Sequence, residues 1–236
     1  MKLSEIFNYL NYGELAEISL GGANEAGILE ENYPAIVSHL NMGLIELYKR
    51  FPLRKNSVKV QMYDSISVYK LITEFSATNG SALIKYILDS AEDPFTGKVL
   101  QIDSVTSDNK EINLILNDTS VTQDVIQTLS HNSFEIINFT PDQILTVNYK
   151  ESPELISVTN LDPSAVEIDL PDSLLEPLVY YIAARAHTNV PSIDGNPSEA
   201  ALYYQKFELS VRKVKEYGLI DNHYNSNTRL DDNGWV

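Results

Sequence analysis

Residues 173–186, SLLEPLVYYIAARA, and residues 196–218, NPSEAALYYQKFELSVRKVKEYG, determine the fold class, because they return the chain to helix after a long strand-like middle. The first stretch opens with Ser173 and Glu176 at capping-box spacing, and Pro177 falls in the first turn. Apolar residues then recur every three or four positions. This period predicts an amphipathic helix over the stretch.

The second stretch also predicts a helix. Asn196 is the expected N-cap, Pro197 takes the first helical position, and Gly218 is well placed to end the helix. Its apolar stripe includes Tyr204 and Leu209. The intervening loop is short, so we expect the two helices to pack antiparallel.

The beginning of the chain is helical by the same period. Residues 32–51 carry apolar side chains on one broad face, with Pro34 near the start and Pro52 after the end. A shorter helix is predicted over residues 3–10. We expect the helices from the two ends of the sequence to meet as one bundle.

The middle of the chain alternates apolar and polar residues, as strands do. The predicted strands are residues 57–62, 98–106, 111–117, 134–139, 143–149 and 166–170. Polar links predict one hairpin between strands 98–106 and 111–117 and another between strands 134–139 and 143–149. Short, regularly spaced strands indicate an antiparallel sheet or a small barrel rather than a parallel α/β sheet.

The predicted fold class is therefore α+β, with an antiparallel helical bundle from the N- and C-terminal helices and an inserted antiparallel β-sheet or small β-barrel. The predicted domains are the bundle over 1–56 and 171–218, the β-rich insertion over 57–170, and an extended C-terminal arm over 219–236.

The composition excludes several classes of protein. The 236 residues include 17 Lys and Arg against 33 Asp and Glu, a net charge of −16, which argues against gripping nucleic acid through its phosphates. The absence of cysteine excludes disulfides and thiolate sites. No run approaches the ~18 apolar residues of a membrane span, and the first residues lack a signal peptide's apolar region. We expect a soluble intracellular protein with no membrane partner.

A search for catalytic or metal-binding motifs finds none that is strong. The four histidines lack partners at helical metal-binding spacing. The loop 21–27 is rich in glycine but lacks the lysine and hydroxyl residue of a P-loop. Residues 231–234 resemble the start of a calcium loop, but the required glutamate is missing. We predict no catalytic, cofactor-binding or metal-binding residues, no cofactor, and no enzymatic activity.

Two surface features are more informative. The last helix is basic in an otherwise acidic chain, through Lys206, Arg212, Lys213 and Lys215. These residues form either a solvated helix face or a surface for an acidic neighbour, which includes a second copy of the chain.

The other feature is the polar tail after Gly218. Apolar side chains punctuate it at Ile220, Tyr224, Leu230 and Trp235. Tryptophan is enriched at the centres of protein interfaces, so the tail is either a docking arm or simply disordered.

Residues 167–185 and 199–208 resemble head-to-tail connector proteins (adaptor or ring proteins) of tailed bacteriophages, including podovirus and crAss-like types. The helix ending at 44–53 and the strand pair near 99–105 and 112–116 fit the same family. The shared features are apolar and tyrosine-rich helix patterns without a catalytic signature.

The resemblance implies a structural virion protein of the neck or tail, assembled in the cytoplasm of the bacterial host. It implies a ring, commonly a dodecamer, that sits beneath the portal protein, extends the DNA channel and docks the next tail or ring protein. DNA would pass without specific binding, helped by acidic walls. The tail, with Trp235 foremost, would grip the portal, and the basic last helix would form the subunit interface.

Two other functions stay open at this point. One is a monomeric or dimeric protein-binding module, and the other is a hydrolase with a carboxylate site between bundle and sheet. Buried acids with raised pKa values would favour the hydrolase. A charged contact surface on two sides of the molecule would favour the ring.

Overall fold

The computed structural model describes residues 1–16, 28–107, 110–117, 125–137, 143–189 and 198–220. The chain is a mixed α+β protein, as predicted. It divides into two compact units, a helical unit of Met1–Pro52 with Glu154–Val236 and a sheet unit of Leu53–Pro153. Residues 154–170 belong to the helical unit, whereas the sequence placed them with the strands.

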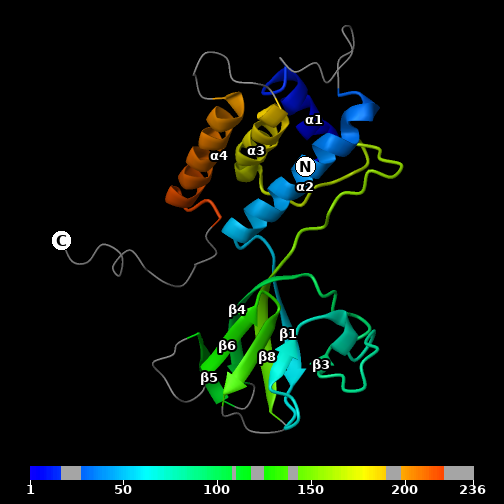
Figure 1. Cartoon of the computed structure of the whole chain (residues 1–236), viewed down its shortest axis with the longest axis vertical. Helices are drawn as coiled ribbons and strands as arrows, with labels where there is room; N and C mark the ends of the chain where they lie inside the picture. The colour runs from blue at the N-terminus through cyan, green and yellow to red at the C-terminus, as the bar shows by residue number, and fades with distance from the viewer. Residues whose placement is uncertain (17–27, 108–109, 118–124, 138–142, 190–197, 221–236) are drawn as a thin grey trace, which may run out of the picture. The chain divides into compact units, whose positions relative to one another are not determined.

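Among the described residues, the helical unit contains four α-helices and three 3-10 turns. The α-helices are α1 (Leu3–Tyr12), α2 (Tyr33–Arg50), α3 (Leu175–Ala186) and α4 (Glu199–Glu216). The 3-10 turns are Glu30–Asn32, Asp172–Leu174 and His187–Asn189. Figure 1 shows α3 between α4 and α2, and α3 packs against all three other helices. The helices predicted from the apolar period are confirmed.

The ends of the last two helices differ from the predicted ones. A 3-10 turn precedes α3 and takes Ser173 into the turn, so the predicted capping box is wrong and the N-cap is Leu174 without a side-chain hydrogen bond. Helix α4 is capped by Ser198, whose Oγ accepts a hydrogen bond from Ala201 N at 3.3 Å. Asn196 lies outside the described residues. Gly218 follows the end of α4 with φ of 61°, a left-handed conformation that favours glycine.

The core of the helical unit is mainly aliphatic, and α2 and α3 approach each other closely at one point in it. Its fully buried side chains include Leu3, Ile6, Leu10, Ile36, Leu40, Leu47, Leu178, Ile182 and Phe207. Gly43 on α2 faces α3, where an added Cβ would lie 2.7 Å from Leu178 Cδ1 and 3.0 Å from Tyr181 Cδ1. A larger residue at this crossing would therefore require the Leu178 and Tyr181 side chains to move.

The segment 154–170 is an irregular strap across α1 and α2. The Asn41 side chain donates to Ile156 O and accepts from Ile156 N, both at 2.9 Å. Leu3 N donates to Val166 O at 3.0 Å, and Tyr48 Oη donates to Asp169 O at 2.8 Å. The predicted strand 166–170 is wrong, because only Glu167 pairs, in an isolated bridge with Lys2.

The sheet unit contains eight strands among its described residues. They are β1 (Lys55–Gln61), β2 (Val68–Lys70), β3 (Ile87–Leu88), β4 (Val99–Ser107), β5 (Lys110–Leu116), β6 (Val125–Ser130), β7 (Ser133–Ile137) and β8 (Ile144–Glu151), with a 3-10 turn at Thr73–Phe75. Their order is β2-β7-β6-β5-β4-β8-β1-β3. All described neighbours are antiparallel except β5 and β6. Strands β2 and β3 are the two edges of the sheet and do not pair with each other, so the sheet does not close and the small-barrel alternative is wrong.

One of the two predicted hairpins forms. Strands β4 and β5 pair antiparallel, with Val105 opposite Leu114, which confirms the first hairpin. The second is wrong, because β7 pairs with β6 and β2, while β8 pairs with β4 and β1. Both edges of β8 are occupied along its length, so β7 has no edge of β8 left to pair with.

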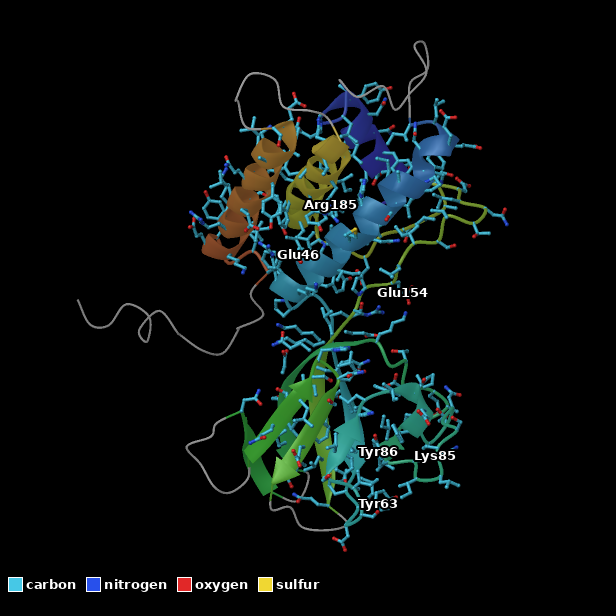
Figure 2. The ribbon with its side chains drawn as sticks, in the orientation of Figure 1. Glu46, Tyr63, Lys85, Tyr86, Glu154 and Arg185 are labelled. Atoms are coloured by element: carbon cyan, nitrogen blue, oxygen red, sulfur yellow. The ribbon has the colours of Figure 1, made fainter. Side chains whose placement is uncertain are left out.

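The core of the sheet unit contains a cluster of aromatic rings among aliphatic side chains. The rings of Tyr69 and Phe134 stack with centroids 5.6 Å apart, and the Tyr86 ring packs edge-on to Tyr69 at 5.1 Å. Tyr86 Oη donates to Lys70 O and accepts from Lys70 N, both at 2.9 Å. Burial raises the pKa of Tyr86 to about 12. Tyr63, whose backbone N donates to Tyr69 Oη at 2.8 Å, lies in the same unit (Figure 2).

Candidate functional site

Helix α4 has one buried face and one uncovered face. Phe207, Val211 and Val214 are buried on the inner side, and the Phe207 ring packs on Tyr181 of α3 with centroids 5.2 Å apart. On the outer side, Leu202 is 44% exposed and Leu209 is 52% exposed. Residues seven positions apart lie on the same side of a helix after two turns. Two exposed leucines on one helix face indicate a contact surface.

A hollow lies between these two leucines. Its volume is about 280 Å³, many times the ~30 Å³ that a water occupies in the liquid. Its lining residues come from α4 alone: Glu199, Leu202, Tyr203, Gln205, Lys206 and Leu209. A hollow of this kind can receive an apolar side chain from a partner.

The four cations predicted as subunit-interface residues divide into two pairs. Lys206 Nζ lies 4.5 Å from the Tyr203 ring centroid and 3.9 Å from Glu14 Oε2. Lys215 Nζ lies 5.6 Å from the Phe51 ring centroid. These two lysines thus contact the chain's own side chains.

Arg212 and Lys213 form the other pair. Both are exposed, and within the described part of the chain neither has an ion-pair partner. We call Leu202, Leu209, Arg212 and Lys213 the α4 face. It combines apolar area with positive charge, as protein interfaces commonly do.

Helix α4 is held in place by a charged contact with α2. Arg50 donates from Nη1 to Glu208 Oε2 at 2.7 Å and from Nη2 to Glu208 Oε1 at 2.9 Å. It also donates from Nε to Glu46 Oε1 at 2.7 Å, and Glu46 is labelled on α2 in Figure 2. The hydrogen bonds from Arg50 lower the pKa of Glu208. The Glu208 carboxylate is therefore paired within the chain, and Glu216 is the exposed carboxylate of α4 that lies within a turn of Arg212 and Lys213.

A buried histidine joins α4 to the end of α1. The His187 ring is 2% exposed, stacks on Tyr203 at 5.0 Å, and places Nδ1 2.7 Å from Glu199 Oε2. Its Nε2 lies 3.2 Å from Glu14 O. Both ring nitrogens thus face groups of the chain itself. The arrangement supports a structural role, as expected for the lone histidines.

A polar hollow of about 380 Å³ lies on the sheet unit. Its described lining is Gln101, Ile102, Asp103, Asn117, Thr128, Ser130 and His131. Asn117 has φ of 57° and uses its amide on Thr128, accepting from Thr128 N at 2.8 Å and donating to Thr128 Oγ1 at 2.6 Å. Asp103 Oδ1 lies 3.8 Å from Lys150 Nζ. These polar groups tie strands together and do not converge on one point.

The most perturbed carboxylate also holds a loop. Asp89 accepts hydrogen bonds from Ser76 Oγ at 2.7 Å, Thr78 N at 3.0 Å, Phe95 N at 2.9 Å and Thr78 Oγ1. Partial burial acts to raise the pKa of Asp89, but these hydrogen bonds outweigh it and hold the pKa well below its usual range. A carboxylate this strongly bonded is ionised and structural.

The described residues carry no raised carboxyl pKa, metal-binding cluster or membrane-spanning helix. The pKa shifts of carboxyl groups resolved there, in Asp89, Asp162 and Glu208, are all downward. No group of three or more His, Asp or Glu side chains in that part of the chain is arranged to hold a metal ion. Nor does any helix of the described chain have the length and apolar character needed to cross a membrane.

The predicted docking arm falls almost entirely outside the described residues. Ile220 is described and half-buried, whereas Tyr224, Leu230 and Trp235 lie beyond it. The loop 21–27 and residues 231–234 are also outside the described part.

The sequence missed the exposure of Leu209 and Tyr204, which it placed in the core stripe of α4. Both are exposed, at 52% and 47%. Leu209 lies two positions from Phe207 and from Val211, so the helical turn carries it well off the buried face. This two-residue offset from the buried positions is the sequence signal that indicates an exposed Leu209.

Comparisons with known proteins identify no relative of this chain. No protein-family model matches the chain, and no curated protein matches it.

Proposed function

We propose that this protein is a structural connector of a tailed bacteriophage particle. In this proposal its copies form a ring, a dodecamer as in the proteins it resembles, between the portal protein and the tail. The ring extends the DNA channel and docks the next tail or ring protein. It belongs to the neck or tail of the virion and assembles in the host cytoplasm.

In the proposed architecture the helical unit and the sheet unit have different roles. The helices of both chain ends form a bundle that makes the contacts between copies, and the sheet unit is inserted into it as a platform for a neighbouring protein. The division of the chain into a discontinuous helical unit and a continuous sheet unit supports this arrangement.

The observation that carries the proposal is the uncovered α4 face. Leu202 and Leu209 leave apolar area in water on a helix that Arg50 holds rigidly through Glu208. A helix backbone that is already fixed loses little entropy on association. Such a face is typical of a subunit that completes its packing by assembly.

The charge of the chain supports a channel for DNA. At a net charge of −16 per copy, a ring would surround DNA with excess negative charge. Negative walls repel phosphates, so DNA would pass without being bound.

The proposed portal-binding segment is the tail from Leu219 to Val236, with Trp235 as its principal contact. The segment begins directly after Gly218 ends α4.

The proposal is tested by native mass spectrometry of the chain with the portal protein encoded in the same genome. The full chain and a variant that ends at Gly218 are compared at equal concentration. A complex with a defined number of copies, lost on truncation, supports the connector and places the portal contact in the tail. No complex with either chain contradicts the connector.

The main alternative is a protein-binding module that acts as a monomer or dimer, since an uncovered helix face also fits such a protein. The same measurement separates the two functions. A module gives one or two copies per partner, whereas a connector gives a ring.

A further inference from the structure

We infer that the α4 face packs against residues 154–169 of a second copy, so that copies associate head to tail. This inference rests on the proposed function for its setting, because it names the surfaces that would join the copies of a ring. We call residues 154–169 the acidic strap.

The acidic strap carries exposed apolar side chains as well. Leu155 is 58% exposed and Val158 is 44% exposed. Exposed carboxylates follow them at Asp162, Glu167 and Asp169. Two cations also lie at this surface: Lys2, which acts on Asp162 and forms a backbone bridge with Glu167, and the α-amino group of Met1, which lies 3.4 Å from Ile168 O. Negative charge therefore prevails on the strap.

The strap is held in a defined conformation. Asn41 of α2 makes two hydrogen bonds to the backbone of Ile156, two residues before Val158. Asp162 accepts from Ser164 N at 2.9 Å and from Ser164 Oγ at 2.7 Å, and these hydrogen bonds lower the pKa of Asp162. A surface fixed in this way is preorganised for binding.

The two surfaces lie on different sides of the same unit. Helix α3 packs against α4 on one side and α2 on the other, and the strap is bonded to α2 at Asn41. Figure 1 shows the yellow-green strap on the side of α2 away from α4. One copy cannot bring its own α4 face onto its own strap, whereas a neighbouring copy can.

The surfaces match in both charge and apolar area. Arg212 and Lys213 would face carboxylates such as Glu167 and Asp169, and the hollow between Leu202 and Leu209 would receive Leu155 or Val158. A twofold pairing of α4 with α4 would instead bring together two faces that each carry Arg212 and Lys213 and no apolar strap residue, and like charges disfavour that contact. Two different complementary patches give a heterologous interface, which builds rings or filaments rather than closed dimers.

The natural absence of cysteine makes the interface testable by trapping. Leu209→Cys and Val158→Cys are prepared as single variants and as a double variant, and each is oxidised with and without the portal protein. We expect a mixture of the two single variants to give one mixed dimer. The double variant should give a ladder of trimers and larger species.

Two results overturn the inference. One is homodimers from each single variant with no excess of mixed dimer, which indicates twofold contacts. The other is no disulfide-linked species in any mixture, with or without portal. Circular dichroism of each variant checks that it is folded.

Charge reversal provides an independent test. The double variant Arg212→Glu with Lys213→Glu should reduce the yield of linked species about tenfold or more, because like charges then meet across the interface. Adding Glu167→Lys with Asp169→Lys on the strap should restore it. The matched control is Lys55→Glu with Lys70→Glu, two exposed lysines of the sheet unit, which should leave the yield unchanged. Failure of the strap changes to restore linkage overturns the pairing.

Failure of this inference and failure of the connector proposal can be told apart. A portal complex without the ladder of linked chains overturns the interface alone. A ladder without any portal complex contradicts the connector and leaves the head-to-tail contact standing.

Discussion

The two units of the chain differ in the side chains that contribute most to fixing their elements. The sheet unit buries a cluster of aromatic rings and gives tyrosine hydroxyls neutral backbone partners, as Tyr86 does with Lys70. The helical unit has a mainly aliphatic core and joins α2 to α4 through the charged pair of Arg50 and Glu208. The sheet unit also uses a charge, at Asp89, but that carboxylate bonds to loop N–H and O–H groups rather than to a cation.

This difference indicates which unit is the scaffold and which makes contacts. A core of interlocked aromatic rings loses much free energy when one ring is removed. Charged contacts at a helix surface contribute less and weaken with salt. The α4 face should contribute least to folding, because its side chains lie in water. Substitutions ranked from core to surface test this order.

The largest effect is expected in the aromatic core of the sheet unit. Phe134→Ala should lower the free energy of unfolding by about 3–5 kcal/mol, because it leaves a cavity beside Tyr69. Urea unfolding followed by tyrosine fluorescence measures the change. The control is Leu83→Ala, which removes a fully exposed side chain of the same unit and should change stability by less than about 0.5 kcal/mol.

A smaller, pH-dependent effect is expected at Asp89. Its folded pKa lies below the ordinary value of 3.8, so its stabilising contribution is complete above that pH and declines as the pH falls through the folded pKa. Asp89→Asn should cost about 1–3 kcal/mol near neutral pH, because it replaces a carboxylate that accepts several hydrogen bonds. Urea unfolding at a series of pH values measures the loss of stability near neutral pH and the decline of stability at low pH.

The Asp89→Asn variant should also lose part of the decline in stability at low pH. An unchanged pH profile would show that other carboxyl groups produce the acid sensitivity.

The charged contact of the helical unit should give a still smaller effect. Arg50→Lys should cost about 1 kcal/mol, because lysine cannot reproduce the two parallel hydrogen bonds to Glu208. The loss should shrink in high salt, which screens the native contact. Thermal unfolding followed at the helical circular dichroism band measures it. Lys49→Gln is the control, since Lys49 lies 3.9 Å from Glu46 but is mostly exposed.

The smallest effect on folding is expected at the α4 face. Arg212→Glu with Lys213→Glu should change the free energy of unfolding by less than about 0.5 kcal/mol, because both side chains are exposed and have no described ion-pair partner. Urea unfolding of the isolated chain measures this change. A loss as large as that of Arg50→Lys would show that the two residues support the fold, and would remove the basis for treating them as a contact surface.

Local pattern predicts the elements more reliably than their pairing. The helical period over 32–51 predicts α2, and the alternation of Val58 and Val60 predicts β1. Strands β2, β3 and β6 were missed. Two or three residues carry too little alternation to detect, and the VIQTLS sequence of β6 does not alternate strictly. The pairing of β8 with β1 joins residues about ninety positions apart, and no local pattern encodes which edge a strand will meet.

The candidate site is likewise predicted from the sequence in part: its charged residues are, and their contacts are not. The count of charges along the last helix is enough to single out Lys206, Arg212, Lys213 and Lys215. It does not show that Lys206 lies against Tyr203 and Lys215 against Phe51, while Arg212 and Lys213 remain exposed.

Composition and short-range periodicity were enough to establish the α+β class, the four main helices, the acidic charge and the basic last helix, because each of these is a property of neighbouring residues or of a residue count. The exposure of Leu202 and Leu209, and the acidic strap of residues 154–169 on α2, follow from the folded chain alone. Exposure depends on which distant segments fold onto a residue. In this chain the helices that enclose the core come from opposite ends of the sequence, so the uncovered surfaces exist only after those ends have met.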